Sequence, residues 1–178
     1  LGSKSQNILG YSSKATLKKV NEIVLEQNAR FEKAYTGLLQ ELVKHNIHIV
    51  NEKELNPEQS EFVRNYFLKE VRNRLMPFLF DKDSDFHNLT DDAIYLAISL
   101  SRKNDEKQKY ALLEVPTDVL PRFVVLPETD ENKYLMFLED IIRFGLKDIF
   151  FIFDFDEIRA YTIKLTRDAE LELTDDIA

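Results

Sequence analysis

Apolar residues near the start of the chain recur with the period of an α-helix. From about residue 14 to residue 45 they occupy one stripe, and charged side chains take the opposite face. The stripe consists of Leu17, Val20, Val24, Phe31, Leu38 and Leu42, with Ala34 and Tyr35 in its gap. No proline interrupts this run, which predicts a helix about 45 Å long at about 1.5 Å per residue. Because such a helix with one apolar seam needs a partner to pack on, we expect part of its bundle to lie outside this chain.

After residue 46 the pattern changes to short strands and short helices. Residues 47–50 predict a strand. Asn56 followed by Pro57, with Gln59 three residues after the asparagine, predicts a helix start, because asparagine caps the helix and glutamine completes a capping box. We expect this helix to end before Pro77, ahead of an extended segment. The residues expected to face inward are Phe62, Tyr66, Phe67 and Val71.

The middle of the chain predicts a β-hairpin and a third strand. Apolar residues alternate over 94–101, polar residues over 102–109 form a turn, and 110–115 return. The third strand is expected over 122–126, where Pro127 stops it.

The last third of the chain predicts a helix over about 133–148 and a strand from Ile158 onward. The helix is expected to bury Leu135, Leu138, Ile141, Ile142 and Leu146. A helix start at Thr174 has no helix behind it, so we expect the chain to be truncated at its C-terminus. Short turns between strands favour an α+β fold: a long amphipathic helix (a bundle remnant) followed by a mixed β-sheet with helices packed on one face.

Composition narrows the class of protein. The chain has 178 residues, a formal net charge of −8, no cysteine and only four glycines. An acidic chain repels phosphate polyanions at long range, which disfavours general nucleic-acid binding. The lack of cysteine excludes thiol nucleophiles and thiolate metal sites, and four scattered glycines build no phosphate-cradling loop. With no transmembrane segment we expect a soluble intracellular chain, and residues 1–3 are typical of a cloning remnant.

Two candidate metal sites in the sequence are weak. Acids alternate over residues 81–85, as in a calcium loop, but Phe86 stands where such a loop needs glycine. His45 and His48 lie on either side of a helix end, so their imidazoles need not converge on zinc. We interpret the acidic segment as a solvated loop, and His87 as a loop histidine.

Two further features each allow two interpretations. Four phenylalanines could form a stacking platform beside Lys147 and Arg159, but alternating phenylalanines between a helix and a strand are typical of a core. They are Phe150, Phe151, Phe153 and Phe155, and we predict that they are core.

Arg167 and Asp168 interrupt a strand and point to opposite faces. Either they form cross-strand or interdomain salt bridges, or the arginine is offered to an anion.

The order of three motifs resembles a known family. Residues 112–116 (LLEVP) and 120–124 (LPRFV) resemble the "vP…lPRFv" signature of the large, phosphohistidine-forming polyphosphate kinases. Residues 138–143 (LEDIIR) resemble that family's "LEdiIr", and 166–170 (TRDAE) its "TRDAdlel". The resemblance covers nearly all of the chain from about residue 17, and three motifs in order at family-like spacing are specific.

The resemblance implies a longer parent enzyme that reversibly transfers the terminal phosphate of ATP to polyphosphate through a phosphohistidine. It implies magnesium, a polyphosphate tunnel and a homo-oligomer, namely a dimer in which the head domain takes part. It also implies a cytoplasmic location, with peripheral attachment at the inner membrane face as an option. Residues 1–46 would end the helical N-terminal domain, and 47–178 would form most of the head, or middle, domain.

By the same resemblance, the family's catalytic, ATP-binding and magnesium-binding residues lie outside this chain. No residue here is therefore assigned a catalytic, cofactor-binding or metal-binding role, and the fragment alone is predicted to be inactive. Arg122, Arg167 and Asp168 are assigned as supports for the tunnel wall or the dimer contact.

Two competing interpretations remain. An independent interaction or adaptor module without enzymatic activity explains an acidic chain with few candidate sites equally well. A small stand-alone enzyme using His87 with Asp83 is disfavoured, because no phosphate-binding loop accompanies them.

Overall fold

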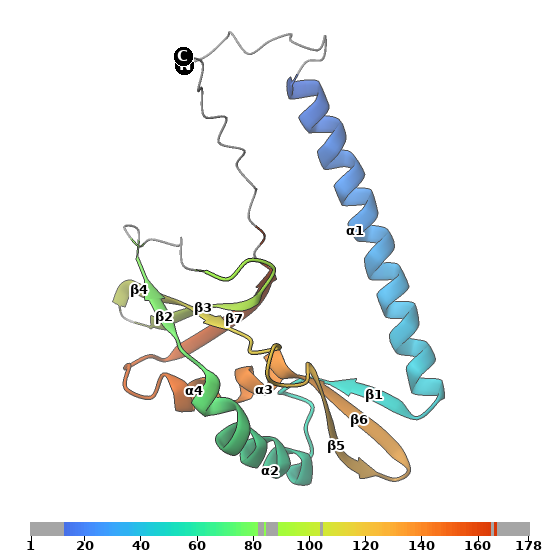
Figure 1. The fold of residues 1–178 in the computed structure, drawn as a ribbon, viewed down its shortest axis with the longest axis vertical. Helices are drawn as coiled ribbons and strands as arrows, with labels where there is room; N and C mark the ends of the chain where they lie inside the picture. Colours follow the sequence, from blue (N-terminus) through green and yellow to red (C-terminus); the bar gives the residue numbers. More distant parts are fainter. Residues whose placement is uncertain (1–12, 82–83, 85–88, 104, 165, 167–178) are drawn as a thin grey trace, which may run out of the picture. The chain divides into compact units, whose positions relative to one another are not determined.

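The computed structural model describes residues 13–81, 84, 89–103, 105–164 and 166. Contacts divide the chain between His48 and Ile49 into two compact units, the first with one long helix and the second with the sheets and short helices (Figure 1). The α+β class and the long N-terminal helix confirm the sequence prediction.

The first unit contains α1 (Ser13–Lys44), a helix of 32 residues where the apolar period predicts one. It ends at the predicted place, since the amide of Asn46 donates to the carbonyl of Val43 at 3.0 Å and Asn46 adopts a φ of 59°. Helices commonly end with a residue in the left-handed backbone conformation after the last turn, and asparagine is one of the residues that adopt it. The apolar stripe is exposed: Leu17, Val20, Val24, Phe31 and Leu38. Within its own unit, the described part of the chain gives α1 no second helix to pack on.

The strand β1 (Ile47–Val50) contains the boundary between the two units. The second unit then continues into α2 (Pro57–Tyr66), whose start confirms the predicted capping box. The Asn56 side chain accepts the Gln59 amide at 2.8 Å, and the Gln59 side chain accepts the Asn56 amide at 3.2 Å. The helix continues through a π-helical turn, η1 (Phe67–Val71), and a 3-10 turn, η2 (Arg72–Arg74). It ends before Pro77, as predicted.

One inward residue of α2 was predicted wrongly. Phe67 and Val71 are fully buried as expected, but Phe62 is exposed and Val63 takes the buried position. Buried residues on α2 and η1 recur every four positions, beginning with Gln59. A π-helical turn has more residues per turn than an α-helix, so this spacing stays on one face through η1.

The larger sheet has the strand order β2-β4-β3-β7, and each of its pairings is antiparallel. Its strands are β2 (Phe78–Phe80), β3 (Ile94–Arg102), β4 (Asp105–Glu114) and β7 (Glu157–Lys164). The predicted hairpin is confirmed as β3 and β4, but the predicted turn over 102–109 is too long, because Arg102 already pairs with Asp105. The polar residues that suggested a turn are equally compatible with strand ends that face solvent.

The smaller sheet has the order β1-β6-β5, where β5 is Phe123–Thr129 and β6 is Asn132–Phe137. Two predictions fail here. The strand does not stop at Pro127; it continues to Thr129 with a register shift after Leu126, and a proline is tolerated at such an irregularity on an edge strand. The predicted helix over 133–148 begins only at Leu138, because β5 and β6 form a hairpin that takes up the residues before it.

One apolar core joins the inner face of the larger sheet to the short helices, which lie on that side in Figure 1. The helices are α2 with η1, α3 (Leu138–Phe144) and α4 (Leu146–Ile149), and they bury Leu138, Ile141, Ile142 and Leu146 as predicted. Leu135, predicted on the same helix, lies in β6 and is half-buried. Tyr95 and Leu112 are buried outside this core, on the opposite face of the sheet.

In the part of the chain that the structure describes, no helix is long and apolar enough to cross a bilayer. Arg167, Asp168, Asp83 and His87 lie outside the described residues, as does the predicted helix start at Thr174.

Candidate functional site

Arg122 is fastened to the start of α3 by its backbone and by its side chain. Its carbonyl accepts the Leu138 amide at 2.8 Å, and its guanidinium donates to Glu139 Oε1 at 3.0 Å. The same guanidinium lies 5.5 Å from the centre of the Phe137 ring, within the range of a cation–π contact. The Arg122 side chain nevertheless keeps 46% of its surface exposed. It is therefore held in one orientation while remaining accessible.

Glu139 is the buried partner of that arginine. Its side chain is only 7% exposed, and it lies in the first turn of α3. Its second oxygen, Oε2, is buried and has no hydrogen-bond partner among the described residues. A buried carboxylate without a cation would be costly, so Arg122 is needed to keep Glu139 inside the fold.

A second ion pair of α3 joins it to the larger sheet. Arg143 donates to the Asp140 carboxylate, to the Thr162 hydroxyl and, at 3.4 Å, to the Ala160 carbonyl, the last two on β7. Burial raises the pKa of the Asp140 carboxyl above its ordinary value of 3.8, although the Arg143 charge opposes that shift. Arg143 thus fixes the position of β7 against α3.

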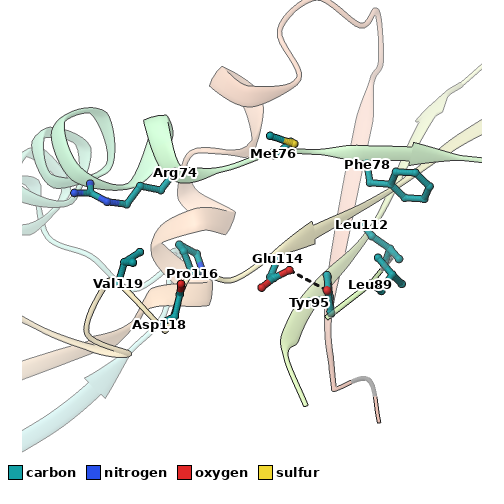
Figure 2. A pocket seen from close by; sticks show the side chains of 10 residues that line it. All are labelled: Arg74, Met76, Phe78, Leu89, Tyr95, Leu112, Glu114, Pro116, Asp118 and Val119. Atoms are coloured by element: carbon teal, nitrogen blue, oxygen red, sulfur yellow. Dashed lines mark hydrogen bonds between the residues drawn. The ribbon is translucent and has the colours of Figure 1, made fainter. Parts of the chain in front are cut away.

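A separate hollow of about 400 Å³ opens on the outer face of the larger sheet (Figure 2). Two of its lining residues are hydrogen-bonded: Glu114 Oε2 accepts the Tyr95 hydroxyl at 2.9 Å, and it also accepts the hydroxyl of the neighbouring Thr90 at 3.0 Å. The Tyr95 hydroxyl in turn accepts the Thr90 amide at 2.7 Å. The lining residues are Arg74, Met76, Phe78, Leu89, Tyr95, Leu112, Glu114, Pro116, Asp118 and Val119.

Of the predicted site residues, only Arg122 lies in the part of the chain that the structure describes, and it lies apart from this hollow. Arg122 does not line it and is instead joined to Glu139. Among the described residues, no three histidine, aspartate or glutamate side chains are grouped to hold a metal. His45 lies 3.9 Å from Glu41, one turn earlier on α1. In the acidic loop, Ser84 closes a local turn, since its hydroxyl donates to the Asp81 carboxylate at 2.9 Å.

The phenylalanine cluster is mostly core, as predicted. Phe150 is fully buried, and Phe153 and Phe155 pack against the core. Phe151 was predicted wrongly: it is exposed, because it lies in the bend between α4 and β7, where alternate residues have no sheet to face. Phe153 receives Lys109 on its ring face at 4.7 Å.

Sequence reasoning missed Glu139 and the Tyr95–Glu114 pair. A signal existed for Glu139, since it lies next to Leu138 and three residues before Ile142, on the stripe that the helical period buries. A charge at such a position indicates a buried partner. No local signal marks Tyr95 and Glu114, which are brought face to face by the register of β3 and β4.

Comparisons with known proteins identify similar chains. A family model described as "Polyphosphate kinase middle domain" matches residues 58–178. The chain is 40% identical over 169 residues to a polyphosphate kinase of Vibrio vulnificus (strain YJ016), covering 93% of this chain and 24% of that protein. It is 38% identical over 165 residues to the polyphosphate kinase of Escherichia coli (strain K12), covering 90% of this chain and 24% of that protein.

A solved structure is similar in fold as well as in sequence. The crystal structure of polyphosphate kinase from Porphyromonas gingivalis superposes with a TM-score of 0.77 at 35% identity, over 90% of this chain and 25% of that one. The chain thus spans about a quarter of the length of the relatives that it matches.

Proposed function

This chain belongs to the polyphosphate kinase family, and we propose that it is a non-catalytic part of an enzyme of that kind. The longer enzyme would transfer the terminal phosphate of ATP reversibly to polyphosphate through a phosphohistidine held by another part of the polypeptide. It would act in the cytoplasm as a homo-oligomer, and residues 1–178 alone would be inactive.

The observation that carries this proposal is the set of contacts made by the charged residues of the family-like motifs. Arg122 pairs with the buried Glu139, and Arg143 joins Asp140 to β7. These motif charges are engaged in contacts that hold the sheets and α3 together. Charged side chains committed to such contacts support a scaffold better than a reaction centre.

The exposed part of Arg122 supports a second role, in which it contacts polyphosphate in the tunnel wall or a second copy of the enzyme. A guanidinium held by Glu139 on one edge has donors left on its other edge, and these suit a phosphate or a carboxylate. Arg167 and Asp168 are proposed for the same support role on the strength of the motif alone, since both lie outside the described residues.

The described residues do not fit the groups that the family implies. Magnesium needs carboxylate oxygens around one point, and no such group of three occurs in the described ranges. We therefore assign Mg²⁺ to other parts of the longer enzyme, and we assign ATP there on the family resemblance alone, with no reaction step given to this chain.

An independent interaction module is the competing proposal, favoured by the hollow on the outer face of the larger sheet. The two proposals predict different effects of Arg122→Gln in a longer enzyme that carries this chain. If the chain supports the enzyme, the substitution should raise the KM for polyphosphate when Arg122 lies in the tunnel wall, or lower the dimer fraction when it lies at the subunit contact. If the chain is an independent module, neither quantity should change. Arg159→Gln is the matched control, because Arg159 is also exposed and also paired with a glutamate.

Steady-state kinetics and light scattering measure these two quantities. An Arg122→Gln enzyme that folds and matches wild type in both would overturn the support role. Residues 1–178 alone, incubated with ATP, Mg²⁺ and polyphosphate, should show no phosphate transfer, and turnover would overturn the non-catalytic assignment.

A further inference from the structure

We infer that the hollow on the outer face of the larger sheet binds a lysine or arginine side chain carried beside apolar residues on another segment of the longer polypeptide. The hollow lies between the stretch that links η2 to β2, the ends of β3 and β4, and the turn after Pro116 (Figure 2). It is on the face of the sheet opposite the core, since Tyr95 and Leu112 are buried there outside the core cluster.

The walls of the hollow are apolar and accessible. Met76 is 85% exposed and Val119 is 60% exposed, although both are large aliphatic side chains. Leu112 lies deeper and is buried. Such walls suit the methylene stem of a lysine or arginine, which buries its stem while its charged end reaches a polar group.

The polar groups in the hollow carry a negative charge. Glu114 and Asp118 are the two acids that line it. The one lining cation, Arg74, belongs to another contact, because it donates to the Glu70 carbonyl and lies 3.4 Å from the Glu70 carboxylate. Figure 2 shows the Arg74 guanidinium directed away from Glu114. The charge complementary to the hollow is therefore positive, which excludes a phosphate or polyphosphate ligand.

The Glu114 carboxylate is ordered before anything binds. Among the described residues, two groups donate hydrogen bonds to it, Tyr95 and Thr90, and both bonds reach the same oxygen, Oε2. A carboxylate fixed through one oxygen offers the other in a set direction, which lowers the entropy cost of binding a cation. Figure 2 shows one Glu114 oxygen turned to Tyr95 and the other turned away from it.

The occupant is a segment of the same polypeptide, because the matched relatives are about four times as long as this chain. Most of a longer relative thus lies outside these residues. A second copy of the chain is a poorer occupant, because a stable dimer contact buries about 800 Å² per partner, and the hollow alone offers a smaller surface than that. The inference rests on this length and on the hollow, and it holds whether or not the proposed phosphate transfer is found.

The first test uses the chain itself and a probe peptide, acetyl-Leu-Lys-Leu-amide, followed by NMR of the ¹⁵N-labelled protein. We expect amide shifts at Glu114, Val119 and neighbouring residues, and weaker or no shifts with the norleucine peptide, which keeps the stem without the charge. Asp118→Asn should weaken lysine-peptide binding about three- to fivefold, and Glu128→Gln, an equal charge loss in the smaller sheet, should leave it unchanged. Equal binding of both peptides, or shifts elsewhere, would overturn the inference.

The second test uses the longer protein with the photo-cross-linking residue p-benzoylphenylalanine at position 119. We expect cross-links within one polypeptide, to a lysine- or arginine-bearing segment outside residues 1–178. The same residue at position 125 is the matched control, because Val119 and Val125 are 60% and 61% exposed and lie on different parts of the fold. Cross-links between two copies, or equal products from both positions, would contradict the assigned occupant.

Discussion

The helices α1 and α2 both carry an apolar stripe, yet the stripes have different surroundings. On α2 and its continuation, Val63, Phe67 and Val71 are fully buried in the core. On α1, Phe31 is 71% exposed, and its neighbours along the stripe are exposed as well. Hydrophobic periodicity thus identifies the face that is suited to burial in each helix. It does not say whether this chain supplies the surface that buries it.

The consequence for stability is that packing energy is concentrated in the second unit. A fully buried phenylalanine is stabilised by transfer from water and by close packing, and an exposed one gains little of either. Equal substitutions in the two regions should therefore have very different effects.

Phe67→Ala should give the largest effect, about 3–5 kcal/mol of lost unfolding free energy, because its fully buried ring would leave a cavity in the core. Phe31→Ala on α1 should cost less than about 0.5 kcal/mol. Urea unfolding of each variant, followed by far-ultraviolet circular dichroism, measures the cost of both substitutions in the whole chain. Similar costs for the two variants would contradict the contrast between the regions.

Two glycines give the next largest effect, with opposite signs. A Cβ added at Gly145 would overlap the Phe67 ring, whereas one added at Gly37, in the middle of α1, meets no atom within 4 Å. Gly145→Ala should thus destabilise the second unit by about 1–3 kcal/mol. Gly37→Ala should raise the helicity of α1, because alanine makes the free energy of helix formation more favourable by up to about 1 kcal/mol. Circular dichroism melting curves measure both, and a neutral Gly145→Ala would show that the Phe67 ring moves freely.

Asn56→Ala tests a local contribution to the same unit. The side chain caps α2 and also donates to the Thr129 hydroxyl at 3.3 Å, so it joins the helix to β5. We expect a loss of about 1 kcal/mol, typical of a helix cap. Asn56→Asp is the matched variant, because it keeps the capping oxygen and removes the donor to Thr129. An equal loss in both would assign the effect to the Thr129 bond rather than to the cap.

The smallest effect concerns pH. Because burial raises the pKa of Asp140, the folded chain holds a proton that the unfolded chain releases once the pH exceeds 3.8. The free energy of unfolding should therefore fall as the pH rises from 3.8 through the raised pKa. Asp140→Asn should flatten this slope in urea titrations over the same range. A slope of equal steepness in the variant would show that a different carboxyl causes it.

Local signals predicted much of the fold. The cap at Asn56 and the end of α1 near Asn46 depend on interactions within a few residues, which sequence alone specifies. The hairpin of β3 and β4 follows from the alternation of apolar and polar residues. Arg122 was found through its motif.

The errors occur where partners distant in sequence decided the structure. The turn that joins β5 to β6 places Asp130 and Glu131 at φ of 51° and 64° without any glycine, so the usual hairpin signal is absent. Residues 132–137 then pair with β5 instead of continuing the helix that their apolar period suggested. Cross-strand packing outweighed helical propensity here.

The sequence by itself determined the class of fold, the end of α1, the start of α2, the resemblance to a family and the arginine that the family motif marks. The tertiary structure alone decided that Glu139 is the buried partner of Arg122, and that Tyr95 and Glu114 meet beneath a hollow of negative charge. The physical reason is the distance along the sequence over which each kind of interaction acts. Caps and periodicity act within one or two turns of chain, whereas burial and ion pairing depend on what strand register and helix packing bring together.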